Sequence, residues 1–130
     1  MRFLDKIVFI TGASSGIGLA TAKKFLEEGA HVILNSRTKS RFNKVSPSIK
    51  EISHSFEFIS GDMSKEKDVD RVFRNIKKKY SKIDIVVNCA GISQNRKYNE
   101  ISMKDWYQTI DNNITNTFLV STKAIELMKS

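Results

Sequence analysis

Cysteine, histidine and long apolar runs are all scarce in this 130-residue sequence. The single cysteine, Cys89, cannot form a disulfide within the chain, and His31 and His54 are too isolated to supply a set of zinc ligands. The longest apolar stretches are far too short to cross a bilayer, and the chain does not open on a charged segment followed by an apolar one. We therefore exclude a disulfide framework and a structural metal, and we expect a cytoplasmic protein without membrane contact.

Acidic side chains are few relative to basic ones: 14 Asp and Glu against 22 Lys and Arg give a formal net charge of +8. Such an excess is typical of proteins that bind nucleic acid. The lysines at residues 77–79, however, close a predicted helix, where the helix dipole favours cations, and no aromatic stacking platform lies beside them. We therefore expect no nucleic-acid partner. A second basic cluster covers residues 37–51, in which Glu51 is the only acidic residue.

Proline is represented only by Pro47, and no repeat, low-complexity tract or linker divides the chain. Short β-branched or aromatic runs alternate with amphipathic segments instead. The short runs, which we predict to be strands, are residues 7–10, 32–34, 56–59 and 83–87. This alternation predicts one α/β domain over residues 1–130, a Rossmann-type doubly wound parallel sheet that is incomplete, with about four strands and helices on both faces.

The amphipathic segments between these strands are expected to be helices. One ends at Gly29, a residue suited to a left-handed helix cap, and another covers residues 65–79. Ser46 followed by Pro47 is typical of a helix start, so the segment between the second and third strands is expected to form two short helical pieces.

The strongest chemical signal is a glycine-rich segment between the first strand and the first helix. Its backbone must turn tightly and approach a pyrophosphate closely, which favours residues without Cβ, while free N–H groups and hydroxyls face the anion. The Gly-x-x-x-Gly-x-Gly spacing does not continue into a P-loop, so a phosphotransferase is excluded. The alternative is a glycine-rich turn without a ligand. The candidate cofactor-binding residues here are Gly12, Ser14, Ser15, Gly16, Ile17 and Gly18, preceded by Thr11.

Three later motifs follow this segment: Asp62-Met63, residues 88–91, and residues 106–118, in which Asn113 lies five residues before Phe118. Together the four motifs resemble the short-chain dehydrogenase/reductase family. Asn88-Cys89-Ala90-Gly91 is similar to the family's Asn-Asn-Ala-Gly, with Cys89 in place of the second Asn, and Asp62-Met63 matches an acidic residue that contacts the adenine ring in the family. The resemblance covers all 130 residues and is closest in wording to the 3-oxoacyl-carrier-protein reductase type. It implies that Asp62, Met63, Asn88, Ala90 and Gly91 face the cofactor. Two alternatives remain: Asp62 as a helix N-cap near Ser64, and residues 88–91 as an ordinary strand-end turn.

The third of these later motifs lies in the last segment, from residue 103 onward, which is predicted to be one long helix. Its apolar stripe comprises Trp106, Ile110, Asn113, Thr117, Val120, Ala124 and Leu127. Because Asn113 falls on this stripe, we expect its carboxamide to be buried and hydrogen-bonded. The resemblance implies that Asn113 is catalytic, holding a water in a proton relay. Asn112 is a competing match, a plain helix-surface Asn is an alternative, and the family prefers Gly at the position of Asn116.

The residues at the end of the second strand distinguish NAD(H) from NADP(H), because an acidic residue there would bind the ribose 2′-OH of NAD(H). This chain has Ser36 and Arg37 there, a hydroxyl and a guanidinium that suit a 2′-phosphate. The basic cluster at residues 37–51 adds to the favourable field. We therefore predict NADP(H) rather than NAD(H), the alternative being that Arg37 is a solvated loop residue.

The family's catalytic Tyr-x-x-x-Lys does not occur in this sequence, because Asp84, Ser102 and Asp111 stand four residues after its three tyrosines. We expect these 130 residues to supply the cofactor-binding half of an oxidoreductase that acts on a small-molecule carbonyl or alcohol, and to be inactive alone. The alternative is a non-catalytic NADP-binding or partner-binding protein. Family members usually pair through this last helix, so a homo-oligomer is also expected.

Overall fold

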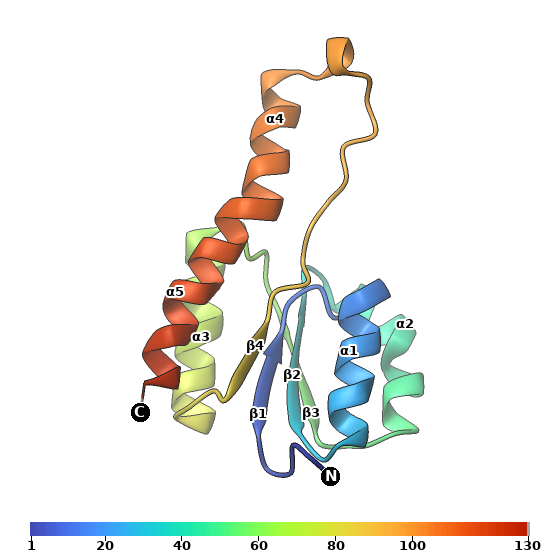
Figure 1. Ribbon diagram of the computed structural model, residues 1–130, viewed down its shortest axis with the longest axis vertical. Coiled ribbons are helices and arrows are strands. Elements are labelled where there is room, and N and C mark those ends of the chain that lie inside the picture. The colour runs from blue at the N-terminus through green and yellow to red at the C-terminus, as the bar shows by residue number, and fades with distance from the viewer. Residues whose placement is uncertain (130) are drawn as a thin grey trace.

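The computed structural model describes residues 1–129, and among them four parallel strands form one sheet in the order β3-β2-β1-β4 (Figure 1). The strands are β1 (Ile7–Ile10), β2 (His31–Ser36), β3 (Phe56–Ser60) and β4 (Ile85–Val87). Helices cover both faces of the sheet. The prediction of a Rossmann-type, doubly wound α/β fold is confirmed.

Each of the first three strands is followed by a helix that returns along the sheet. These helices are α1 (Gly16–Glu27), α2 (Lys39–Lys50) and α3 (Glu66–Tyr80). After β4 the chain extends away from the sheet, passes a short 3₁₀ turn at Tyr98–Glu100, and comes back as α4 (Met103–Ile110) and α5 (Asn116–Met128). In Figure 1, α1 and α2 lie on one side of the sheet, and α3 and α5 lie on the other.

The core consists of two clusters, one on each face of the sheet. Val8 and Ile10 of β1 pack into the cluster beneath α1 and α2, whereas Phe9 packs into the cluster beneath α3 and α5. All three side chains are fully buried. Successive strand residues point to opposite faces, so a strand covered on both sides is apolar throughout. This explains why the strands are visible as continuous apolar runs in the sequence.

The strand order reverses between β1 and β4, and a crevice opens at the carboxyl ends of strands at such a reversal. At the opposite, amino ends of these two strands, Asp84 aligns them: its N–H donates to the Ile7 carbonyl at 2.9 Å, and its carboxylate accepts from the Ile7 N–H at 2.8 Å. The bond from the Ile7 N–H holds the pKa of Asp84 below its ordinary value. The resulting register pairs Val8 with Ile85, so β1 and β4 end side by side.

Most predicted element boundaries agree with the structure. Gly29 follows α1 with a φ of 89°, the predicted left-handed conformation, and α3 differs from its predicted range by one residue at each end. Strand β4 is shorter than predicted, since Ile83 is buried but lies ahead of the paired residues. Among residues 1–129, no helix has the length and apolar character needed to span a membrane.

The prediction of two short helical pieces before β3 is wrong, because α2 is one helix with Pro47 inside it. The helix start is Thr38, whose hydroxyl accepts a hydrogen bond from the Arg41 N–H at 3.4 Å. Phe42, Ser46 and Ile49 form a continuous buried side that extends past the proline. Packing of this side therefore outweighs the hydrogen bond that Pro47 cannot donate.

The prediction of one long helix after residue 103 is confirmed in extent, since residues 103–128 are helical without a break, but the predicted apolar stripe is wrong in part. A π-helical turn, Asp111–Thr115, separates α4 from α5 and rotates the later residues relative to the earlier ones. Trp106 and Thr117, which were predicted on the buried stripe, are exposed. The buried residues of α5 are Asn116, Val120, Ala124 and Leu127.

Replacing Pro47 with Ala restores an N–H that can donate to the Asn43 carbonyl, so P47A is expected to stabilise the fold by about 1–2 kcal/mol after the greater freedom of the unfolded chain is counted. Thermal or urea unfolding measures the change. The matched control is K44A, an exposed position on the same helix, with an expected change below about 0.5 kcal/mol. A destabilised P47A would show that the proline fits α2 without cost.

Candidate functional site

A cleft of about 540 Å³ lies at the carboxyl ends of the strands, at the reversal between β1 and β4. Its walls come from the loops that follow all four strands. Every predicted site residue lines it except Asn88 and Asn113. The residues that line it without having been predicted include Asn35, Arg41, Gly61, Ser64, Cys89, Ile92, Ser93, Asn112 and Asn116.

The glycine loop, residues 11–18, makes backbone contacts that no larger residue could make. Gly12 has a φ of 60°, and a Cβ there would lie 2.8 Å from the Ala90 Cα. A Cβ on Gly18 would lie 2.1 Å from the Gly12 carbonyl oxygen. Gly16 has a φ of 52° but open space around it, so only its backbone conformation favours glycine. These contacts leave the loop as a thin wall around the cleft.

The N-terminus of α1 opens onto the cleft and is suited to an anion. Ser15 is the N-cap residue, yet its hydroxyl makes no capping hydrogen bond within residues 1–129. The first turn of α1 also contains no acidic side chain. The first N–H groups of a helix lack acceptors within it and carry the positive end of its dipole. A pyrophosphate can accept hydrogen bonds there, with Ser14 and Ser15 beside it.

Basic side chains lie at the end of β2. Arg37 and Arg41 are exposed at the mouth of the cleft, and Asp62 is the only carboxylate among its described lining residues. Ser36 is buried, and its hydroxyl donates to the Thr38 carbonyl at 3.1 Å, so it supports the turn more than it offers a free donor. Arg41 was not predicted as a site residue, although it belongs to the basic cluster at residues 37–51.

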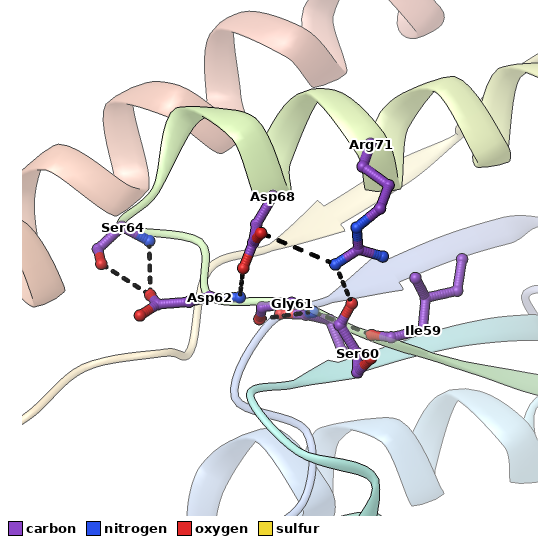
Figure 2. Close-up of polar contacts among 8 residues, drawn as sticks. Ile59, Ser60, Gly61, Asp62, Ser64, Asp68 and Arg71 are labelled. Atoms are coloured by element: carbon purple, nitrogen blue, oxygen red, sulfur yellow. Dashed lines mark hydrogen bonds and ion pairs between the residues drawn. The ribbon is translucent and has the colours of Figure 1, made fainter.

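Asp62 forms a turn at the end of β3 (Figure 2). Its carboxylate accepts hydrogen bonds from the Ser64 N–H at 3.0 Å and the Ser64 hydroxyl at 2.7 Å, and its own N–H donates to Asp68 at 2.8 Å. The alternative role of Asp62 as a helix N-cap is wrong, since α3 begins at Glu66 with Lys65 as its N-cap. Met63 lines the cleft from the core and is 3% exposed.

The β4 loop, residues 88–92, is held by Thr11 at the end of β1. The Thr11 hydroxyl accepts the N–H groups of Cys89 at 3.1 Å and Ala90 at 3.0 Å. Asn88 points elsewhere, and its amide donates to Ser121 on α5 at 3.3 Å. Burial raises the pKa of the Cys89 thiol and so disfavours the thiolate, the nucleophilic form of cysteine.

The prediction of a buried Asn113 is wrong: its side chain is exposed, and the described residues of α4 and the π-helical turn contain no buried position. The carboxamide is nevertheless fully hydrogen-bonded. It accepts from the Ile92 N–H at 3.2 Å and donates to the Ile92 and Thr109 carbonyls, each at 2.9 Å. A Cβ on Gly91 would lie 2.7 Å from the Asn113 carboxamide oxygen. Asn112, the competing match, is the residue that lines the cleft.

A family model described as short chain dehydrogenase matches residues 6–130. The chain belongs to the short chain dehydrogenase family. A 3beta-hydroxysteroid dehydrogenase from Mediterraneibacter gnavus is 36% identical over 129 residues, which are 98% of this chain and 47% of that protein. An uncharacterized oxidoreductase from Thermotoga maritima is also 36% identical, over 99% of this chain and 51% of its own length.

A solved structure of a short-chain type dehydrogenase/reductase from Mycobacterium ulcerans superposes with a TM-score of 0.88 at 23% identity. The match covers 98% of this chain and 48% of that one, and it shows the shared fold. The chain thus spans about half the length of the relatives that it matches. This family assignment agrees with the resemblance carried by the four sequence motifs.

The glycine loop predicts different costs for two alanine substitutions. G12A combines a left-handed backbone with a clash against Ala90, so it is expected to destabilise by more than about 3 kcal/mol. G16A serves as the matched control, because it meets no atom within 4 Å and carries only about 1–2 kcal/mol of backbone strain. Denaturant unfolding compares the two variants. Equal losses would contradict the close contact between Gly12 and Ala90.

Proposed function

We propose that residues 1–130 are the cofactor-binding half of an NADP(H)-dependent oxidoreductase, which transfers hydride to or from a carbonyl or alcohol substrate. The observation that carries this proposal is the composition of the cleft. It combines the glycine loop and the uncapped start of α1 with two guanidinium groups, one directly after β2 and one in the first turn of α2, at a topological reversal where such sheets bind dinucleotides.

The residues present fit NADP(H) in three places. Gly12 and Gly18 let the glycine loop pack tightly against its own backbone neighbours, the space beside Gly16 is open, and the free N–H groups of α1 suit the pyrophosphate there. Arg37 and Arg41 suit the 2′-phosphate of the adenosine ribose, since a guanidinium is a planar, charge-assisted donor. The turn at Asp62 and Met63 closes the side of the cleft next to β3, where the adenine would lie.

The nicotinamide half would lie over the β4 loop, because the adenosine ribose is held at β2 on the other side of β1. When bound, NADP(H) supplies or accepts the hydride. Asn113 holds the β4 loop through Ile92 in this arrangement. Its role in a proton relay, which the family resemblance implies, remains part of the proposal.

Proton transfer would depend on residues outside these 130, since no Tyr-x-x-x-Lys occurs among them. We expect the 130-residue chain to bind cofactor without turning over substrate. The relative from Mediterraneibacter gnavus is named for a hydroxysteroid, which supports an alcohol or carbonyl as the substrate class. Ile114, Phe118 and Ile125 are exposed on the last helical segment, which supports pairing of two copies there. A cytoplasmic location is a separate part of the proposal.

Titration of the purified 130-residue chain with NADPH and NADH, followed by nicotinamide fluorescence, tests the proposal. NADPH is expected to bind more tightly. R37Q is expected to weaken NADPH about 30-fold, because one charge-assisted phosphate contact contributes about 2 kcal/mol, and to leave NADH nearly unchanged.

The matched control is R74Q, which removes an arginine that does not line the cleft and should leave both affinities unchanged. Tighter binding of NADH than of NADPH, or an R37Q variant with unaltered preference, would contradict the assignment of NADP(H). Absence of binding by the folded chain to either nucleotide would contradict the proposed function itself.

A further inference from the structure

Asn116 is a buried carboxamide in the wall of the cleft, 5% exposed, at the first position of α5. Its amide donates to the Asn112 carbonyl of the preceding turn at 2.8 Å and to the Ala90 carbonyl of the β4 loop at 3.2 Å. Its carboxamide oxygen accepts from the Thr117 N–H at 2.7 Å. Both amide hydrogens are therefore used, and one of them links the helix to the loop.

The Ala90 peptide is held from two directions. Its N–H donates to the Thr11 hydroxyl at 3.0 Å, and its carbonyl accepts from Asn116. Between these two bonds, the Ala90 backbone lies against Gly12, so closely that a Cβ on Gly12 would come within 2.8 Å of it. A shift of Ala90 would consequently change the contact between the β4 loop and the glycine loop.

The position of Asn116 also calls for a polar role. The other buried residues of α5, Val120, Ala124 and Leu127, are apolar and serve the core. A buried carboxamide on that stripe has a desolvation cost that only its hydrogen bonds offset. Asn113 secures Ile92 beyond Gly91, whereas Asn116 secures Ala90 before it, so the two side chains hold the loop on both sides of the glycine.

We propose that Asn116 is a positioning residue for the nicotinamide half of the cofactor: it holds Ala90 against the glycine loop without touching the reacting atoms. This inference rests on the proposed function, in which the nicotinamide half lies over the β4 loop. The adenosine half lies over β2 and β3, more remote from Ala90, so the two halves of the dinucleotide depend on Asn116 to different degrees.

The variant N116S separates the two hydrogen bonds. A serine hydroxyl can donate to the carbonyl four residues earlier, as Thr122 does to Phe118 at 3.0 Å, but it is too short to reach Ala90. NADPH affinity is measured by nicotinamide fluorescence, and adenosine 2′,5′-bisphosphate affinity is measured by calorimetry. N116S is expected to weaken NADPH about fivefold and to leave the bisphosphate within about twofold of its original affinity.

The matched control is T122A, which loses a hydrogen bond on the same helix without a link to the β4 loop and should change neither affinity. Equal weakening of both ligands by N116S, or weakening of neither, overturns the proposal. If N116S does not fold, N116A gives the same comparison. Failure of both to fold while T122A folds makes Asn116 a purely structural residue and also overturns the proposal.

A wild-type chain that binds neither ligand refutes the proposed function, but it does not test whether Asn116 holds the β4 loop. Hydrogen exchange then tests that contact: the amides of residues 90–92 are expected to exchange faster in N116S than in the wild type. Unchanged exchange at those amides would show that Asn116 does not hold the loop.

Discussion

The backbone contact between Gly12 and Ala90 is the constraint on which the cleft depends. The Thr11 hydroxyl, beside Gly12, binds two successive N–H groups of the β4 loop and brings the ends of β1 and β4 together. The absence of a Cβ at Gly12 lets the two loops touch. Because β1 and β4 lie on the two sides of the strand-order reversal, this contact forms the base of the crevice, and the other loops form its sides.

The chemistry of the cleft follows from its position at the carboxyl ends of parallel strands. The helix that follows β1 points its N-terminal N–H groups into the cleft, and the turn after β2 adds guanidinium groups beside them. Positive partial and full charges are thus gathered where a phosphorylated dinucleotide would place its pyrophosphate and 2′-phosphate. The single carboxylate of the described lining, Asp62, is held by Ser64 at the far wall.

The sheet and the glycine loop could be predicted from the sequence because their signals are local. An apolar run buried on two faces, followed by glycines that permit a left-handed turn, needs no knowledge of distant residues. The continuity of α2 through Pro47 could not be predicted in this way, since it depends on the packing of Phe42 and Ile49 beneath the helix. Local helix signals favoured a break at Ser46, and tertiary packing overrode them.

The helical segment after residue 103 also shows that local sequence signals do not predict which residues are buried. The helical period places Asn113 in the core, but in the structure the buried stripe begins at Asn116, and no residue of α4 or the π-helical turn is buried. Thr11 acts through hydrogen bonds to the β4 loop, far along the chain. Arg41 lines the cleft about one helical turn after Arg37. Their residue types alone do not distinguish them from ordinary strand-end and helix-surface residues.

The central claim is that the glycine loop and the β4 loop form one dinucleotide site. The most direct test is a two-dimensional ¹H–¹⁵N NMR titration of the 130-residue chain with NADP⁺. The account predicts that the amides of Gly16, Gly18, Ala90 and Gly91 shift together, with one common dissociation constant. Shifts confined to the basic cluster at residues 37–51 would contradict it, because they would indicate nonspecific binding of phosphate to surface charge.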